Sequence, residues 1–554
     1  MTRLSPGSCL RPASVGLLLA LFLLISQVSH AQQTSPHTAD ATDQLSQLIY
    51  TGKQLEVEGR WGEALNHYQR ALKVLPENQQ IRTRRSISRI HYDLNRRYAD
   101  SKYVETLANI GSTRALNLYA EVLLKIQSYY VIQPNWDNIL RHGLASMEIA
   151  LSDASFVRMN LPNVEQNRIQ PAIDRMNAVL KRYQVSSRQD AYVVASNVCR
   201  NLQQDLGLPL QTSVYEFTSG AIIALDPYSA FMTSNQYGET MSQIEGNFVG
   251  LGVELKTHPD HLEIVNVIAG GPAGRAGMRS GDRLVAIENE SVESMGSDVA
   301  ADALRGVEGS YINVTVIREN GRQAPLRMQR RRVEIPSVED VAIIDPESGI
   351  GYLKLSNFQK TTARDFDAAL WQLQRQGMRS LIVDVRGNPG GLLNSAVDIS
   401  DRFISNGVIV STKGRNPLED YVHRAKTAGT WRVPLVVLID ENSASASEIF
   451  AAAIADHQRG TVVGTQSYGK GSVQGIFPLN VGGGGVRLTT AKFYSPDGSP
   501  ISQIGVSPAV PVQSTARPVA DDQQAEPGDQ TDDILRVGVS VARRSLGQQQ
   551  YAGN

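Results

Sequence analysis

The sequence predicts a multidomain α+β protein, and three changes of pattern along its 554 residues support this prediction. From about residue 44 to 243 the apolar residues recur at helical spacing. From 244 to 333, short runs of alternating apolar and polar residues are separated by glycines, which predicts a compact β-rich module. From 334 to 512, apolar strands alternate with helical stretches.

The segment 334–512 is expected to form a sheet with helices on both faces. Its strands at 381–385 and 435–439 carry apolar residues on both faces, which is typical of strands buried between two layers of helices. Helical stretches are expected near 363–376 and 447–456. The segment is long enough to bury a core of its own.

The last segment, 513–554, differs in composition from the rest of the chain. It is polar and rich in proline, aspartate and glutamine. Such a composition buries too little apolar surface to offset the entropy of ordering the chain. We therefore expect a largely disordered tail, with one short helix from Asp532 to Leu546.

The first 31 residues have the pattern of a secretory signal. Arginines precede an apolar run from Val15 to Ile25, and Ser29-His30-Ala31 follows as a cleavage site. The run is shorter than the roughly 20 apolar residues of a membrane-spanning helix. We expect residues 1–31 to be cleaved and the protein to be exported to the periplasm or cell envelope. The alternative is an uncleaved anchor, which would be the only membrane contact.

Composition excludes several classes of function. The chain is 41% hydrophobic and 20% charged, as in globular proteins, and its formal net charge of -1 gives no electrostatic case for a nucleic-acid partner. After signal cleavage only Cys199 remains. The exported chain can therefore form neither an intrachain disulfide nor a cysteine-based metal cluster.

The helical region 44–243 contains one repeat-like segment. Trp61 to Leu65, followed by Tyr68, Ala71-Leu72 and Pro76, resembles the second half of a tetratricopeptide repeat. A solenoid needs three or more copies, and the sequence shows one. We expect a helical region that mediates self-association or binds an adaptor.

Three turns within 334–512 carry candidate chemistry, and the first runs from Asp440 to Glu448. Here a strand ends, small residues follow, and a helix starts. A side chain in such a turn lies at a helix N-terminus, where free backbone N–H groups suit an oxyanion hole. The alternative is that the serines and alanines only cap and fill a tight strand-to-helix packing.

The second turn runs from Gly464 to Gln474. Residues 464–470 fit the phosphate-loop pattern G-x-x-x-x-G-K, but Gly471 replaces the required Ser or Thr, and a strand pattern follows instead of a helix. Ser467 to Lys470 also fits S-x-x-K, yet glycine disfavours the helix that this motif needs. Nucleotide-binding and β-lactamase functions are therefore disfavoured.

The third turn follows the strand at Asp384. Gly390 and Gly391 end it, and glycines let backbone N–H groups approach a ligand without a side chain in the way. An ordinary tight turn is the alternative for this stretch taken alone.

Together the three turns fit a serine hydrolase whose base is a lysine. The region has no G-x-S-x-G elbow, and its only histidines, His423 and His457, are poor candidates for the base. Lys470 can act only when neutral, which costs roughly 4–5 kcal/mol at pH 7 from an ordinary pKa of about 10.4. Burial would lower that cost, and Gln474 is placed to orient the amine without adding charge.

At these residues the sequence resembles the carboxyl-terminal processing peptidases, also called tail-specific proteases. The family's S-A-S-A-S-E segment is met at Ser443–Glu448, and its T-F-G-K-G-x-x-Q segment at Ser467–Gln474, with Ser-Tyr in place of Thr-Phe. Leu225–Ser229 and Tyr494–Gly498 are further matches.

The resemblance implies a role for each candidate site residue. Ser445 would be the nucleophile, Lys470 the base and Gln474 an accessory residue. The oxyanion hole would be formed by the amide of Ala446 and an amide of Gly390 or Gly391. The resemblance also implies a crotonase-like or ClpP-like layered core, with no metal and no organic cofactor.

The β-rich module 244–333 resembles a PDZ domain. Alternation from Phe248 to Lys256 predicts one strand, and Phe248–Val253 is similar to the PDZ carboxylate-binding loop. The resemblance implies that a polypeptide C-terminal end adds to a sheet edge near Gly250, Leu251, Gly252 and Val253.

The sequence thus predicts an exported serine endopeptidase that takes polypeptide substrates with accessible C-termini. It would recognise these ends through its PDZ domain and cleave through an acyl-enzyme formed by Ser445 and Lys470. The alternative is a non-catalytic scaffold, in which the tetratricopeptide-like and PDZ parts gather partners around an inert peptidase core.

Overall fold

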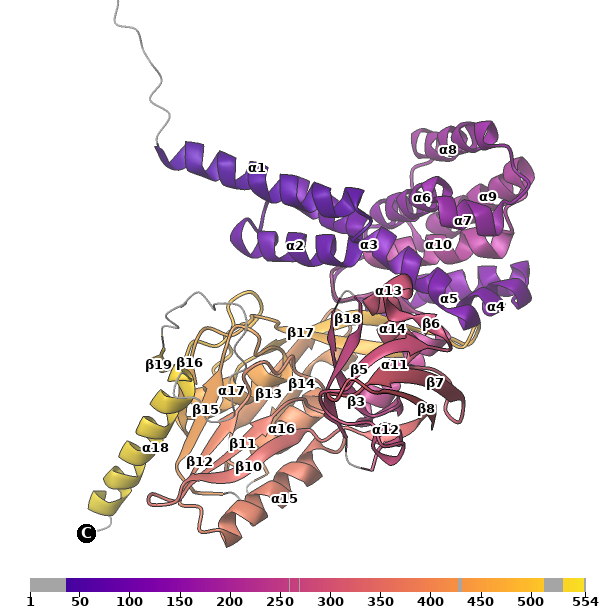
Figure 1. Ribbon diagram of the computed structural model, residues 1–554. Helices are drawn as coiled ribbons and strands as arrows, with labels where there is room; N and C mark the ends of the chain where they lie inside the picture. The colour runs from indigo at the N-terminus through magenta and orange to yellow at the C-terminus, as the bar shows by residue number, and fades with distance from the viewer. Residues whose placement is uncertain (1–35, 259, 269, 427–430, 513–531, 553–554) are drawn as a thin grey trace, which may run out of the picture. The chain divides into compact units, whose positions relative to one another are not determined.

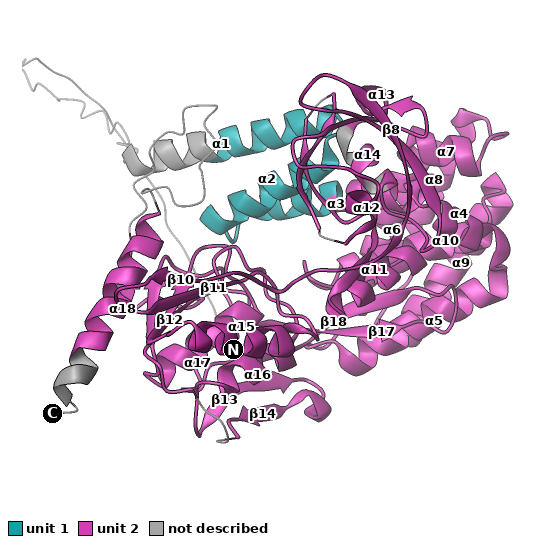
Figure 2. Ribbon diagram, turned by 60° about the horizontal axis from the view of Figure 1, so that its bottom comes forward, with its two compact units in different colours: residues 1–88 teal, residues 89–554 magenta. Residues whose placement is uncertain are grey.

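The computed structural model describes residues 36–258, 260–268, 270–426, 431–512 and 532–552 (Figure 1). The expected signal segment, 1–31, lies outside this range. The chain forms two compact units that divide between Ser88 and Arg89 (Figure 2). Among the described residues, no helix has both the length and the apolar character that a bilayer crossing requires.

The first unit is built from paired helices. It contains α1 (Pro36–Val57), α2 (Trp61–Val74) and the first part of α3 (Gln79–Ala99). Ala64, Tyr68 and Ala71 of α2 are buried in its small core. Gly52 of α1 lies directly against the Tyr68 ring, where a Cβ would clash. Small residues at this crossing let α1 and α2 pack closely.

The helical layer of the second unit, residues 101–244, is built around the buried helix α10 (Leu210–Ile223). Every residue of α10 from Thr212 to Ile222 is buried, so this helix forms the centre of the helical layer. The helices are α4 (Ser101–Asn109), α5 (Ser112–Tyr129), α6 (Trp136–Ser152), α7 (Ala154–Asn160), α8 (Ile169–Asn177), α9 (Arg188–Leu206), α10 (Leu210–Ile223) and α11 (Ser234–Ile244).

The β-rich module contains a sheet of order β3-β4-β5-β7-β8, with β6 on β5, and a separate pair β2-β9. Its helices are α12 (Pro272–Arg275), α13 (Val292–Met295) and α14 (Ser297–Ala303). Its strands are β2 (Asn247–Gly250), β3 (Val253–Thr257), β4 (Leu262–Val267), β5 (Arg283–Ile287), β6 (Glu290–Ser291), β7 (Tyr311–Ile317), β8 (Gln323–Gln329) and β9 (Arg331–Glu334).

The single strand predicted from Phe248 to Lys256 is wrong, because the chain breaks between β2 and β3. Gly252 has a φ of 78°, which a continuous strand does not allow. The carbonyls of Leu251 and Gly252 accept hydrogen bonds from the Ala273 and Ile268 N–H groups, at 2.8 and 2.9 Å. The two residues therefore form a short loop between the strands.

The core is a six-stranded sheet of order β10-β11-β12-β15-β16-β19. Only β10 is antiparallel to its neighbour. The strands are β10 (Val338–Asp345), β11 (Ile350–Leu355), β12 (Ser380–Asp384), β15 (Leu435–Ile439), β16 (Thr461–Gly464) and β19 (Val510–Pro511).

Both faces of this sheet are covered by helices, as predicted. Alternate residues of a strand point to opposite faces. Leu381 and Val383 of β12 pack in the core formed with α15 (Thr362–Arg375), α16 (Leu393–Asp401) and α17 (Ala446–Asp456). Ile382 faces the other way, into the core formed with α18 (Asp533–Ala552).

The helix predicted within the polar tail is present as α18, whereas residues 513–531, where disorder was expected, lie outside the described residues. It begins where the short helix was expected and continues to Ala552. Val541 and Ala542 are buried against sheet residues such as Ile382 and Leu438. The helix thus covers the second apolar face of the sheet. This packing joins segments far apart in the sequence, so the composition of the tail alone does not predict it.

An antiparallel sheet of order β1-β18-β13-β14, with β17 on β18, borders the core. Its strand β17 begins two residues after Lys470, so this sheet places the candidate base. The strands are β1 (Ala230–Met232), β13 (Val408–Gly414), β14 (Tyr421–Arg424), β17 (Ser472–Pro478) and β18 (Gly485–Tyr494).

Candidate active site

Ser445 lies in a strained turn between β15 and α17. Its φ of 58° and ψ of -112° are unusual for a residue with a side chain. The turn is held from within, because the Asp440 carboxylate accepts hydrogen bonds from the Asn442 and Ser443 N–H groups at 3.0 and 2.9 Å. The half-buried Ser445 is therefore presented at the N-terminus of α17 by the surrounding hydrogen bonds.

The glycine turn after β12 lies beside Ser445. A Cβ on Gly390 would stand 2.8 Å from Ser445 Cβ and 2.9 Å from the Ala446 nitrogen. Only a glycine allows this approach, and its φ of 103° also favours glycine. The structure thus brings Gly390, Ser445 and Ala446 together.

The candidate oxyanion donors differ in their hydrogen bonding. The Gly390 N–H donates to Asn388 Oδ1 at 2.8 Å. Within the described part of the chain, no acceptor is recorded for the N–H groups of Gly391 and Ala446. Ala446 is the first residue of α17, where an N–H group has no partner inside the helix.

Lys470 lies in the loop between β16 and β17, and its side chain is half-buried. Burial lowers the pKa of Lys470 below its ordinary value, and the nearby Arg487 guanidinium lowers it further, while Glu448 opposes the shift. Nζ lies 5.1 Å from the centre of the Tyr228 ring. Burial raises the pKa of Tyr228 to about 12, so the ring stays neutral and the contact is a cation–π interaction.

The structure does not join the candidate base to its expected partners. Between the described residues Ser445 and Lys470, no side-chain hydrogen bond is recorded. The Gln474 amide donates instead to the carbonyl and hydroxyl oxygens of Ser472, at 3.1 and 2.8 Å. Gln474 therefore does not orient the amine in this arrangement.

The PDZ-like segment lies at the open edge of its sheet. Among the described strands, β3 is the terminal strand of the sheet and pairs with β4 alone. Gly250 ends β2 and Val253 begins β3, with Leu251 and Gly252 forming the loop between them.

The sheet core and the β-rich module each match a known family. Residues 349–512 match the family described as Peptidase family S41, and residues 263–318 match the PDZ domain. A carboxy-terminal-processing protease of Bartonella bacilliformis is 37% identical over 302 residues, which cover 53% of this chain and 68% of that protein. The chain belongs to the carboxyl-terminal processing protease family.

Two further relatives show how far the likeness extends. A carboxyl-terminal-processing protease of Synechocystis is 32% identical over 329 residues, covering 58% of this chain and 76% of that protein. Among solved structures, the photosystem II D1 C-terminal processing protease is 23% identical, with a TM-score of 0.36, over 75% of this chain and 98% of that one. That TM-score is too low to transfer site geometry.

Sequence reasoning missed the role of Glu448 in this member of the family. Glu448 lies in the first turn of α17, is fully buried, and accepts four hydrogen bonds. One oxygen accepts from the N–H groups of Ser445 and Lys470, at 2.7 and 2.9 Å. The other accepts from the Ser467 hydroxyl and the Gly469 N–H, both at 2.6 Å.

Glu448 thus ties the nucleophile turn to the loop of the candidate base through a single carboxylate. The sequence contained one usable signal, because an acidic residue three positions after a helix-capping serine often bonds back to the cap. That rule predicts the bond to the Ser445 N–H, but not the three bonds to residues 467–470.

Metal-dependent chemistry has no candidate ligand cluster in the described ranges. No group of three or more His, Cys, Asp or Glu side chains is placed there to hold a metal ion.

We predict that Glu448→Gln weakens both the fold and the activity. An amide has one acceptor oxygen, and its NH₂ group would face N–H or O–H donors, leaving buried donors unpaired at about 1–3 kcal/mol each. The free energy of unfolding in urea should fall by about 2–4 kcal/mol. Glu441→Gln is the matched control, since Glu441 is exposed in the same turn and accepts one bond, from Thr465 at 3.2 Å. Equal stability of the two variants would contradict the bridging role.

We predict that Gly390→Ala strongly lowers peptidase activity while the protein stays folded. The new methyl group would push against Ser445 and Ala446, and displacing an oxyanion donor costs roughly 10²–10³-fold in kcat. Gly387→Ala is the control, because Gly387 has a φ of 70° but no neighbour within 4 Å of an added Cβ. If both variants lose the same activity, backbone strain rather than the close approach is responsible.

Proposed function

We propose that the chain is a serine endopeptidase that recognises polypeptide C-terminal ends through its PDZ domain and cleaves by a Ser445–Lys470 acyl-enzyme mechanism. The observation that carries the proposal is the pairing of a strained, helix-capping Ser445 with a half-buried Lys470 of lowered pKa, tied through Glu448. Burial and the charge of Arg487 both favour the neutral amine that a base requires.

In the proposed reaction the neutral Lys470 amine takes the proton of the Ser445 hydroxyl as its oxygen attacks the substrate carbonyl. The Ala446 and Gly391 N–H groups receive the developing oxyanion, since the Gly390 N–H is already engaged by Asn388. Lys470 then returns the proton to the leaving amine, and water hydrolyses the acyl-enzyme.

Catalysis requires a rearrangement of the base. In the structure Lys470 Nζ lies over the Tyr228 ring, and the Gln474 amide donates to Ser472. The reactive arrangement needs the Lys470 side chain to turn toward Ser445, with Gln474 free to accept from or donate to the amine. Substrate binding is the proposed trigger for this change.

Polypeptide ends are the proposed ligands of the PDZ domain. The terminal strand β3 has unpaired backbone groups along one edge, which an extended peptide can join as an added strand. The loop at Leu251 and Gly252 is the proposed site for the terminal carboxylate.

Three further points belong to the proposal. The pair α1–α2 is proposed to be one tetratricopeptide-like unit that supports self-association or adaptor binding, as the close contact of Gly52 with Tyr68 suggests.

The peptidase core is proposed to have the crotonase-like or ClpP-like layering. Export to the periplasm or cell envelope is proposed from the signal pattern of residues 1–31.

The alternative of an inert scaffold has one observation in its favour. The missing hydrogen bond between the described side chains of Ser445 and Lys470 is also what a core without activity would have. A chemical test of Ser445 separates the two functions.

We predict that Ser445→Ala and Lys470→Ala each remove cleavage of a substrate with an unstructured C-terminal tail. Nucleophile and base act as one unit, so each change should cost about as much as both together. A phosphonate probe should label Ser445 in the parent chain, as read by mass spectrometry. Cleavage by Ser445→Ala at the parent's rate would end the peptidase proposal, and absence of labelling across several probes would favour the scaffold.

We predict that kcat/KM rises with pH along a limb set by Lys470, because only the neutral amine accepts a proton. Since the pKa of Lys470 is lowered, the limb should lie below the value of about 10.4 for an ordinary lysine. Arg487→Gln removes a positive charge that lowers this pKa, so the limb should move to higher pH. Arg487→Lys keeps the charge and serves as the control; a limb that moves equally in both variants would contradict the electrostatic account.

A further inference from the structure

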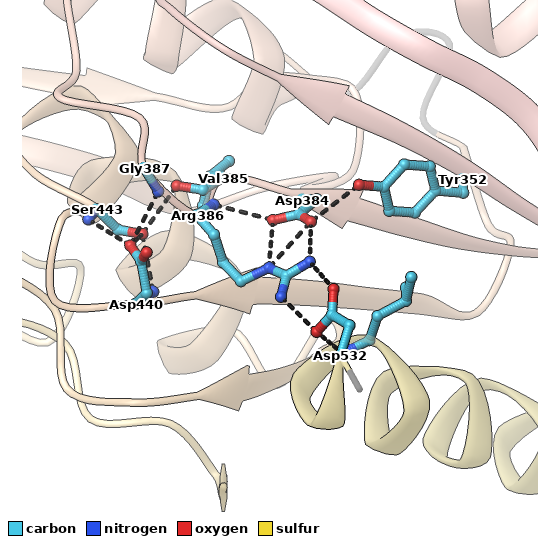
Figure 3. A network of polar contacts seen from close by, with 9 residues as sticks. Tyr352, Asp384, Val385, Arg386, Gly387, Asp440, Ser443 and Asp532 are labelled. Carbon is cyan, nitrogen blue, oxygen red and sulfur yellow. Dashed lines mark hydrogen bonds and ion pairs between the residues drawn. The ribbon is translucent and has the colours of Figure 1, made fainter. Parts of the chain in front are cut away.

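Arg386, the first residue of the glycine turn, is held between two carboxylates (Figure 3). Its guanidinium donates to Asp384 at 2.6–3.0 Å and to both oxygens of Asp532 at 2.7 and 2.8 Å. Tyr352 donates its hydroxyl to Asp384 at 2.9 Å. The two-pronged contact fits the planar fork of an arginine.

Asp532 immediately precedes the C-terminal helix α18 and lies far along the chain from Arg386. Its Oδ1 also accepts from the Leu535 N–H at 3.0 Å, so Asp532 caps α18 while it binds Arg386. Asp532 is buried enough to lose solvation, yet its pKa is lowered by the Arg386 guanidinium. Asp532 therefore stays ionised to a lower pH than an ordinary aspartate does.

A second ion pair holds α18 at a different position. Arg543 donates to Asp345 at 2.7 Å, and this pair has no contact with the glycine turn in the described chain. Between the two ion pairs, α18 packs on the apolar face of the sheet. Of these two ion pairs, the one at Asp532 joins α18 to the glycine turn, and the one at Arg543 does not.

Hydrogen bonds also join the glycine turn to the segment that carries Ser445 (Figure 3). The Gly387 N–H donates to Asp440 at 2.9 Å, and the Ser443 hydroxyl donates to the Val385 carbonyl at 2.8 Å. The Ala444 N–H donates to the Asn388 carbonyl at 3.0 Å. A displacement of residues 385–388 would therefore move both Gly390 and Gly391 of the glycine turn and the turn that carries Ser445.

We propose that Asp532 is a positioning residue for catalysis: by clamping Arg386 it holds the glycine turn and the Ser445 turn in register, so that α18 is part of the catalytic unit. This inference rests on the proposed Ser445 mechanism. It assigns a catalytic contribution to residues that lie outside the matched peptidase region, 349–512.

The inference predicts a loss of turnover rather than of substrate binding. Without the second carboxylate, Arg386 keeps Asp384 as a partner but loses the contact that fixes its outer nitrogens. Small displacements at a reacting centre cost up to about 10²-fold in rate. The PDZ edge at β3 is not part of this network, so KM should stay unchanged.

The test compares Asp532→Asn with Arg543→Gln in the full chain. We expect Asp532→Asn to lower kcat about 10- to 100-fold, to leave KM unchanged, and to weaken inhibition by a peptide boronic acid, whose tetrahedral adduct needs the oxyanion donors. Arg543→Gln, which removes an ion pair of the same helix, should retain the parent's kcat. Asp532→Glu should restore part of the activity.

Each outcome decides between defined possibilities. If Asp532→Asn keeps the parent's kcat and boronate affinity while Ser445→Ala is inactive, the positioning role is wrong and the peptidase proposal stands. If both helix variants lose kcat equally, with parallel losses of thermal stability, docking of α18 matters only for folding and the inference is overturned. If Ser445→Ala is as active as the parent, the proposed function itself fails.

Discussion

The buried carboxylate of Glu448 is the interaction on which the site depends. A strained turn at Ser445 and a loop at Lys470 belong to different parts of the sequence, and neither is held by its own residues alone. Glu448 bonds a backbone N–H of each and so restrains the two segments relative to one another, together with the hydrogen bond from the Tyr468 N–H to the Ser443 carbonyl. A buried carboxylate is stable only when its hydrogen bonds are satisfied, and here four donors satisfy it. The same contacts that make the charge tolerable therefore build the site.

The placement of this carboxylate has an electrostatic consequence for the base. An anion near Lys470 favours the ammonium, which opposes its use as a base. Glu448 directs its lone pairs at backbone and hydroxyl donors, while burial and Arg487 act in the opposite sense on the amine. The net effect is a lowered pKa for Lys470, so the bridge through Glu448 does not outweigh the effects that favour the neutral amine.

Much of the site could be predicted because its elements are local in sequence. The turn at Ser445 and Ala446 follows from a buried strand, small residues and a helix start within nine positions. The rest depends on long-range pairs that no local pattern encodes: Arg386 meets Asp532 across 146 positions, and α18 fills a sheet face that tail composition gave no reason to assign to it. The orientation of Gln474 toward Ser472 likewise results from rotamer choice in the folded state, which spacing does not determine.

The central claim is that Glu448 holds the Ser445 turn and the Lys470 loop together, so that the neutral Lys470 amine can take the proton of the Ser445 hydroxyl. A crystal structure of the chain with a peptide phosphonate bonded to Ser445 tests it most directly. The account predicts Lys470 Nζ within about 2.6–3.2 Å of Ser445 Oγ, with all four bonds to Glu448 kept. An amine that stays over Tyr228 in that adduct, or a Glu448 released from the Lys470 loop, would contradict it.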